Sequence, residues 1–253
     1  MQVWDQCKLQ YKYKYHLKME PMQPQPYHFV YGKIIHKIAE EYVKAGGKLT
    51  IQQCHDMVFN KEVPIDSDKE GNPVFAKKVN KEYKNKLPKH MLAVAHLTDK
   101  LGFGGEVEME IKHDLDPPNG KTIQAFIDRL LINNGVYRII DYKTTKKGRF
   151  QKTERDIVDD LQLRIYCRLI QLKYNVEAEK IMAALFYVDG STLVPVRYSQ
   201  ESLERAEREL LEAYDEIHEM PPENAYGNVG DHCRRCDWRK ICPFWSVTGK
   251  GIH

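Results

Sequence analysis

Residues 122–144 read TIQAFIDRLLINNGVYRIIDYKT, and this stretch decides the fold class. On each side of the Asn-Asn-Gly at 133–135, β-branched and apolar residues recur in short runs that are typical of strands. Asn-Gly is a frequent turn between antiparallel strands, so we expect a β-hairpin. The two strands carry Asp128 and Asp141. Lys143 follows Asp141 by two residues and therefore points to the same face of its strand.

The flanking segments predict an alternation of helices and strands. Residues 26–45 have helical periodicity and are followed by a Gly-Gly pair, whereas residues 106–111 alternate between carboxylates and apolar residues, as in a strand. A long helix from about 153 to 174, followed by the apolar run at 181–188, predicts a crossover between parallel strands. A strand at 192–198 and a helix opening at Ser199 complete the order. The expected core stripe of the long helix is Val158, Leu161, Ile165, Leu169 and Leu172.

This order predicts an α/β fold built on a mixed sheet flanked by helices. Residues 49–102 turn polar and lysine-rich, and we interpret them as a mostly helical insertion. Lysines crowd part of this insertion, and a solvated helix face is the favoured interpretation, with a strip that tracks phosphates as the alternative. The lysines of this run are Lys77, Lys78, Lys81, Lys84, Lys86 and Lys89.

Composition adds little about function. The formal charge of +3 over 253 residues is too small to argue nucleic-acid binding, and 42% apolar residues are enough for a substantial core. No apolar stretch approaches the roughly 18 residues that a membrane helix needs. The amino terminus lacks the apolar segment of a secretory signal. We therefore expect a soluble protein of the cytoplasm (the host cytoplasm if it is viral), with no membrane partner.

The carboxylates and the lysine suggest phosphodiester hydrolysis, which uses divalent metals held by carboxylates to activate water. A lysine beside a bound phosphate can stabilise the charge of the transition state. An isolated Asp-x-Lys is common, and surface charges on the wet face of a sheet are the alternative. The pattern gains meaning from its companions.

Asp128, followed by Asp141-Tyr142-Lys143-Thr144, resembles the signature of PD-(D/E)XK nucleases in the D-Y-K-T form of their RecB-like branch. Thr145 stands where that branch often has glycine, which affects a turn and not the chemistry. Two further pairs match motifs of the branch, a Q-x3-Y helix downstream and a G-x3-H helix upstream. These pairs are Gln162 with Tyr166, and Gly32 with His36.

The resemblance implies a restriction-endonuclease-like core and a role for each matching residue. The implied ligands of Mg²⁺ or Mn²⁺ are His36, Asp128, Asp141 and the backbone carbonyl of Tyr142. Lys143 would be catalytic, and Gln162 and Tyr166 would position DNA or the active site. Taken alone, a core histidine is the favoured interpretation of His36, and ordinary packing is the favoured interpretation of Gln162 and Tyr166. An upstream glutamate could assist, and Glu106, Glu108 and Glu110 are equal candidates.

Cysteine spacing predicts a second site. Cys233, Cys236 and Cys242 form a C-x2-C-x5-C cluster near the carboxyl end, and Cys7 lies near the other end. Because thiols stay reduced inside cells, such a cluster indicates a metal rather than disulfides. The two remaining cysteines, Cys54 and Cys167, are expected to be single buried thiols.

The same four cysteines match the split pattern of RecB-like nucleases that carry a 4Fe-4S cluster, with one cysteine before the fold and three after it. Lys8 stands where that family usually has proline. The implied cluster would staple Cys7 to the segment 221–253, with zinc as the alternative occupant. Trp238, Phe244 and Trp245 are expected to shield it. The aromatic and basic run at 11–15 either binds a DNA strand or packs beneath the cluster.

We therefore predict one RecB-like nuclease domain over residues 1–253, acting as a DNA exonuclease on single strands or duplex ends. The resemblance is to the CRISPR-associated RecB-like exonuclease family, its phage stand-alone relatives and the nuclease domains of RecB- and AddB-type helicases. It implies recombination, repair, phage or CRISPR-related DNA processing, with helicase or CRISPR-adaptation partners. The alternatives are an end-processing subunit of a larger complex and a non-catalytic iron–sulfur DNA-binding module.

Overall fold

The computed structural model describes residues 2–22, 26–76, 79–116, 120–146, 148 and 151–245, without the side chains of Gln2, Glu108, Leu115 and Asp116. The chain forms two compact units. One is Tyr27–Glu207, and the other combines Met1–Pro26 with Arg208–His253. No helix of the described residues is long and apolar enough to cross a membrane.

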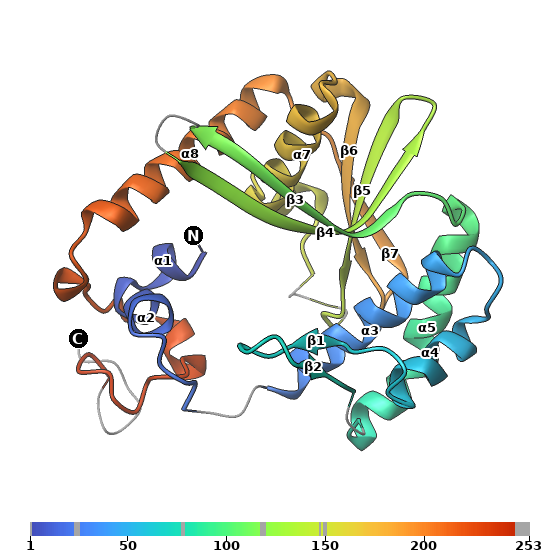
Figure 1. Ribbon diagram of the computed structural model, residues 1–253, viewed down its shortest axis with the longest axis horizontal. Coiled ribbons are helices and arrows are strands. Elements are labelled where there is room, and N and C mark those ends of the chain that lie inside the picture. Colours follow the sequence, from blue (N-terminus) through green and yellow to red (C-terminus); the bar gives the residue numbers. More distant parts are fainter. Residues whose placement is uncertain are drawn as a thin grey trace. The chain divides into compact units, whose positions relative to one another are not determined.

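A five-stranded mixed sheet is the centre of the Tyr27–Glu207 unit (Figure 1). Its strand order is β3-β4-β5-β6-β7, with β5 and β6 parallel and the other pairs antiparallel. This confirms the predicted α/β fold with a mixed sheet flanked by helices. The strands are β3 (Glu106–Asp116), β4 (Lys121–Asn133), β5 (Val136–Lys143), β6 (Ile181–Tyr187) and β7 (Thr192–Val196).

The β4–β5 hairpin turns where the sequence predicts. Asn134 and Gly135 have positive φ values of 51° and 72°, the conformation that a tight Asn-Gly hairpin turn requires. At the open end of the hairpin, the last pair of the β4–β5 ladder is Arg129 with Ile140. Asp128 and Asp141 therefore follow directly after the paired region, on neighbouring strands.

Helices lie on both faces of this sheet. Three of them, with apolar residues of β4, β5 and β6, form one buried core that includes Ile34, Val94, Tyr142 and Phe186. On β5, alternation sends Tyr142 into this core and Asp141 to the opposite face. Helix α7 (Leu161–Tyr174) packs against β6, β5 and β3. The three core helices are α3 (Tyr27–Lys44), α4 (Ile51–Phe59) and α5 (Lys81–Leu101).

The prediction of one long helix over residues 153–174 is wrong in one respect, because this range forms two helices. The two helices are α6 (Glu154–Ile157) and α7, which are separate because Asp160 accepts a hydrogen bond from the backbone N–H of Leu163 and begins a new helix. Val158, expected on the core stripe, lies in the break and is 53% exposed. The sequence signal for this break is Asp160, a helix-capping residue that lies within an otherwise continuous apolar periodicity.

Residues 49–102 contain α4 and α5 and also a short hairpin, β1 (Asp66–Ser67) with β2 (Pro73–Val74). Lys81, Lys84 and Lys89 are exposed on α5, which agrees with the solvated helix face. Lys77 and Lys78 of the same run lie outside the described residues.

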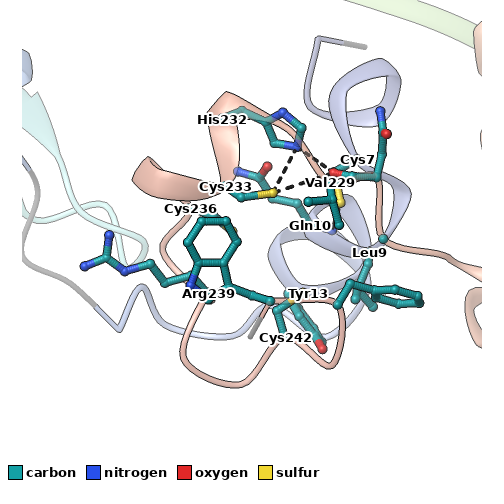
Figure 2. Close-up of a pocket in the computed structure, with 14 residues that line it drawn as sticks. Cys7, Leu9, Gln10, Tyr13, Val229, His232, Cys233, Cys236, Arg239 and Cys242 are labelled. Atoms are coloured by element: carbon teal, nitrogen blue, oxygen red, sulfur yellow. Dashed lines mark hydrogen bonds between the residues drawn. The ribbon is translucent and has the colours of Figure 1, made fainter. Parts of the chain in front are cut away.

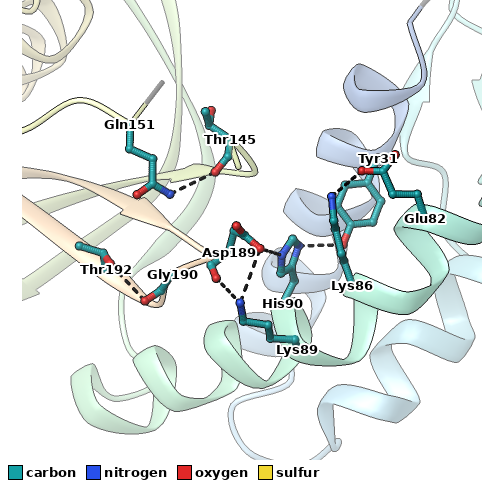
Figure 3. Close-up of polar contacts among 10 residues, drawn as sticks. All are labelled: Tyr31, Glu82, Lys86, Lys89, His90, Thr145, Gln151, Asp189, Gly190 and Thr192. Atoms are coloured by element: carbon teal, nitrogen blue, oxygen red, sulfur yellow. Dashed lines mark hydrogen bonds and ion pairs between the residues drawn. The ribbon is translucent and has the colours of Figure 1, made fainter. Parts of the chain in front are cut away.

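A buried polar network ties α5 to α3 and to the β6–β7 turn (Figure 3). The Tyr31 hydroxyl lies 2.8 Å from Nδ1 of His90, whose Nε2 lies 3.1 Å from a carboxylate oxygen of Asp189. Tyr31 and His90 are almost fully buried. Burial lowers the pKa of His90 below its usual value, although Asp189 opposes the change. The network fixes α3, which also carries His36.

The second unit is built from both chain ends. Its amino-terminal part has α1 (Gln2–Gln6), α2 (Lys8–Tyr11) and a π-helical turn at Lys12–His16. Helix α8 (Gln200–Glu219) begins in the sheet unit and ends in this one, and the short turns Pro222–Asn224 and Asp231–Arg235 follow it. Lys8, the residue after Cys7, is buried, pairs with Glu216 at 3.0 Å and lies over the Trp4 ring.

Candidate active site

Two carboxylates meet where strands β4 and β5 stop pairing. Asp128 accepts a hydrogen bond from the backbone N–H of Tyr142 at 2.8 Å, so its side chain takes the place of a ladder contact. Asp141 follows the paired residue Ile140 and is only 4% exposed. The hairpin thus brings together the two aspartates that the sequence singled out.

Their pKa values move in opposite directions. Burial raises the pKa of Asp141 to about 6, with Asp128 adding to the rise and Lys143 opposing it. Burial also raises the pKa of Asp128, but His36, the Tyr142 amide and Lys143 outweigh it and hold that pKa below its usual value. Two buried carboxylates in one place cannot both ionise without a compensating cation. This pair therefore has the electrostatics of a cation site.

Lys143 lies against this pair. Its Nζ is 2.6 Å from Oδ2 of Asp141, as expected for residues two apart on one strand face. Burial lowers the pKa of Lys143, but Asp141, Asp128 and Asp160 outweigh burial and raise that pKa above its usual value. The side chain is therefore a protonated ammonium at neutral pH, and it is one-third exposed, so a phosphate can reach it.

His36 comes to the site from helix α3. Its Nδ1 lies 3.1 Å from Oδ1 of Asp128, and its side chain is 29% exposed. Gly32, one turn earlier on the same helix, faces Thr144, since a Cβ atom built on Gly32 would lie 3.5 Å from the Thr144 hydroxyl. The helix therefore approaches the end of β5 closely, and this approach brings the G-x3-H and D-Y-K-T segments together.

Gln162 and Tyr166 contact each other one turn apart on α7. The Gln162 amide donates to the Tyr166 hydroxyl at 2.7 Å. Burial raises the pKa of Tyr166 to about 12, and Asp141 and Asp128 add to the rise. This electrostatic influence indicates that the pair lies near the two aspartates, on the face of the sheet that α7 covers.

A cleft of about 850 Å³ opens beside these residues. His36, Asp128, Tyr142 and Lys143 line it, together with residues that the sequence analysis did not single out. Spacing could have identified Lys33, one turn before His36 on α3, and Phe126, two residues before Asp128 on β4. Asp66 of the insertion reaches the cleft only through tertiary folding. The additional lining residues include Phe29, Lys33, Lys37, Asp66 and Phe126.

The upstream glutamates remain unassigned. The Glu106 carboxylate accepts a hydrogen bond from Tyr174 at 3.0 Å, and that of Glu110 accepts one from Gln124 at 2.6 Å and pairs with Lys112. Neither of these two glutamates lines the cleft. The side chain of Glu108 lies outside the described residues.

The donor set of the cleft suits a hard divalent cation. Within the described part of the chain, no group of three or more His, Cys, Asp or Glu side chains could hold a metal ion. Magnesium usually takes only one or two carboxylates and completes its shell with water and substrate phosphate. The Asp128–Asp141 pair, with its raised Asp141 pKa, fits that mode of binding.

The four cysteines of the predicted cluster line one small cavity of the other unit (Figure 2). Backbone N–H groups point at their sulfurs: that of Gln10 at 3.5 Å from Cys7 and that of Gly230 at 3.4 Å from Cys233. The amides of Trp238 and Phe244 likewise lower the pKa values of Cys236 and Cys242, although burial raises both, that of Cys236 to about 11.

Four cysteine sulfurs are the donors that a soft metal or an iron–sulfur cluster takes, although burial keeps Cys236 and Cys242 as thiols in the metal-free protein. Phe244, Trp245 and Tyr13 also line the cavity, whereas Trp238 is buried and donates to the carbonyl of Glu20 at 3.2 Å. Cys54 and Cys167 are buried and are not among the residues that line it, as expected.

Several known proteins are similar to this chain. Gene 69 protein of Mycobacterium phage L5 is 26% identical over 143 residues, which are 54% of this chain and 44% of that protein. The chain thus spans less than half the length of this relative. A solved structure of a "putative exonuclease" from Eubacterium rectale superposes with a TM-score of 0.52 and 13% identity, over 90% of this chain and 80% of that one.

At that identity the likeness shows the fold alone. The crystal structure of SSO0001 aligns over 93% of this chain and 94% of its own, at 16% identity and with a TM-score of 0.41. The sequence profile of the PD-(D/E)XK nuclease superfamily matches residues 2–243, which is nearly the whole chain. This protein therefore belongs to the PD-(D/E)XK nuclease superfamily.

Proposed function

We propose that this protein is a DNA exonuclease that depends on Mg²⁺ or Mn²⁺ and acts on single strands or duplex ends. The observation that carries the proposal is the buried Asp128–Asp141 pair with Lys143 Nζ 2.6 Å from Asp141, at the edge of a cleft. A lone acidic pair would fit many sites. An acidic pair with an adjacent protonated lysine suits a phosphodiester, because carboxylates hold the cation and the ammonium meets the phosphate.

Each residue has a proposed role. Asp128, Asp141, His36 and the Tyr142 carbonyl hold the metal, which when bound would activate water and neutralise charge on the phosphate. Lys143 donates to a phosphate oxygen and balances the charge that develops there. Asp141 orients Lys143 through their ion pair. Gln162 and Tyr166 position the carboxylates from α7 and form the edge of the DNA path.

We further propose that Cys7, Cys233, Cys236 and Cys242 hold a 4Fe-4S cluster, as in RecB-like nucleases, with zinc as the alternative. The amide donors toward their sulfurs support a thiolate site. Residues 1–253 would then be one functional nuclease domain, with the insertion at 49–102 and the cysteine segment at 221–253. Helicase or CRISPR-adaptation partners remain predictions that the resemblance implies, and a cytoplasmic location remains a prediction from the sequence.

The deciding experiment uses anaerobically purified full-length protein with end-labelled single- and double-stranded DNA, with and without Mn²⁺. The matched variants are Lys143→Ala, in the site, and Lys89→Ala, an exposed lysine of α5 outside the cleft. We expect metal-dependent release of nucleotides from ends by wild type and Lys89→Ala, and a loss of at least about a hundredfold in Lys143→Ala.

Circular single-stranded DNA separates exonuclease from endonuclease activity, since an exonuclease leaves it intact. Equal activity of Lys143→Ala and wild type would refute the assigned chemistry. Tight DNA binding without cleavage under any metal condition would favour the non-catalytic binding module. Activity that appears only with a co-purified protein would favour the end-processing subunit.

A further inference from the structure

Two large aromatic side chains stand exposed in the cleft of the candidate active site. Phe29 is 55% exposed and Phe126 is 52% exposed, and both line the cleft with His36, Asp128 and Lys143. Single exposed apolar residues are ordinary on protein surfaces. Two phenylalanines from different elements in one polar cleft, beside a charged site, are not explained by packing.

Phe126 lies on the same strand face as Asp128. The two residues are separated by one position on β4, so their side chains point to the same side and start about 7 Å apart along the strand. Across the ladder Phe126 pairs with Glu110, which is engaged with Gln124 and Lys112. Among the residues that the structure describes, no aromatic ring stacks on Phe126. Its face is thus available to a bound molecule.

Phe29 belongs to the helix that carries His36. The ring of His28 lies 4.4 Å from the Phe29 ring, centroid to centroid, and supports it from one side. Phe29, Lys33 and Lys37 follow one another at four-residue spacing, so they share a helix face, and all three line the cleft. Lys33 pairs with Asp66 and Lys37 with Glu40. An arriving phosphate can exchange with the Asp66 carboxylate, whose side chain is 39% exposed, whereas the Glu40 side chain is only 5% exposed.

An aromatic ring beside basic groups is the arrangement that binds unpaired nucleobases, because every base has a π-face and every linkage a phosphate. We infer that Phe29 and Phe126 form a nucleobase-stacking subsite for the nucleotides that flank the scissile phosphate. The inference rests on the proposed function and deepens it. The faces of a base inside a duplex are covered by the neighbouring base pairs, so the subsite favours single strands and frayed ends.

The test asks whether removing a phenylalanine and removing a nucleobase affect the same contact. KM and kcat are measured for full-length protein on labelled single-stranded DNA and on the same strand with one abasic residue placed at successive positions from the end. For wild type we expect one or two positions where the missing base raises KM about tenfold, the usual size of a base–aromatic contact. Phe126→Ala and Phe29→Ala raise KM similarly on intact DNA, with kcat little changed.

The decisive result comes from combining a protein variant with an abasic strand. In each alanine variant, KM no longer rises when the base that stacks on the removed phenylalanine is missing, whereas in Phe126→Trp it still rises. Ile132→Ala is the matched control, since Ile132 is an exposed apolar residue of the same β4 face, 43% exposed, outside the cleft. It behaves as wild type. Unchanged KM in both alanine variants, or equal abasic sensitivity in variants and wild type, overturns the subsite.

The two proposals fail differently. Wild-type cleavage with no coupling to either phenylalanine rejects the subsite and leaves the nuclease in place. Absence of cleavage rejects the nuclease assignment, and the same set of changes is then read as equilibrium binding of intact and abasic strands to wild type, Phe126→Ala and Phe29→Ala. Equal affinities there reject the subsite as well.

Discussion

Asp141 is a buried carboxylate whose charge is unfavourable in the metal-free protein. Its pKa of about 6, against 3.8 for the free side chain, means that the folded chain binds the proton more tightly than the unfolded chain. The contribution of Asp141 to the stability of the metal-free protein therefore grows as pH falls from 7 through 6 toward 4, because this residue binds a proton more readily in the folded than in the unfolded chain. A bound cation would take the place of this proton, so its affinity falls over the same window.

We predict that Asp141→Asn abolishes cleavage and stabilises the metal-free protein at pH 7, by on the order of 1–3 kcal/mol. Urea unfolding of both proteins at several pH values between 7 and 5 measures this. The difference in unfolding free energy between variant and wild type should shrink as pH falls. The lowered pKa of His90 acts in the opposite sense, but its contribution is the same in both proteins and drops out of this difference. A variant less stable than wild type at pH 7 would contradict the electrostatic account.

At the scale of elements, the site depends on how helix α3 is held. Tyr31 of α3 and His90 of α5 are buried and joined at 2.8 Å, and Asp189 of the β6–β7 turn completes the chain of contacts at 3.1 Å (Figure 3). Removing one member leaves a buried polar group without its partner, and that penalty exceeds the net gain from the bond. The network therefore fixes three elements to each other.

We predict that Asp189→Ala costs about 1–3 kcal/mol of unfolding free energy, because Nε2 of His90 loses its buried acceptor. Lys89→Ala removes the 3.6 Å ion pair between an exposed lysine and the same aspartate, and a hydrogen bond to the Asp189 backbone carbonyl, and should cost no more than about 0.5 kcal/mol. Denaturant midpoints of the two variants give the comparison. Equal losses would mean that the surface pair, and not the buried contact, carries the stabilisation.

At the scale of the whole molecule, the two chain ends belong to one compact unit. Residues that are more than 220 positions apart in sequence contact one another there, as when the Asn228 amide donates to the carbonyl of Gln6 at 3.2 Å. A metal or cluster that joined Cys7 to Cys233, Cys236 and Cys242 would close almost the entire chain into a loop. Such a closure restricts the unfolded state.

We predict that Cys236→Ser lowers bound metal in anaerobically purified protein and destabilises the unit of the chain ends by several kcal/mol, the order expected for a link that closes a long loop. Elemental analysis and thermal unfolding measure the two effects. Cys54→Ala, a buried thiol outside the cavity, should keep the metal. Zinc instead of iron would reject the 4Fe-4S cluster, and full metal content in Cys236→Ser would reject the ligand set.

Much of the architecture could be predicted from local signals. The Asn-Gly turn and the strands around it, the helix of residues 26–45 and the parallel crossover all appear in the structure within a few residues of their predicted bounds. They follow from periodicity and turn chemistry, which act over short distances. The break at Asp160 was missed because a capping side chain changes one hydrogen bond without altering the apolar pattern.

The sequence by itself determined the fold class, the hairpin that carries Asp128 and Asp141, and the pairing of Asp141 with Lys143, since strand geometry dictates them. Only the tertiary structure decided that His36 meets Asp128 across 92 positions, and that Phe29 and Phe126 share a cleft. It also decided the raised pKa of Asp141. These properties depend on burial and on contacts between distant elements, which no local pattern encodes.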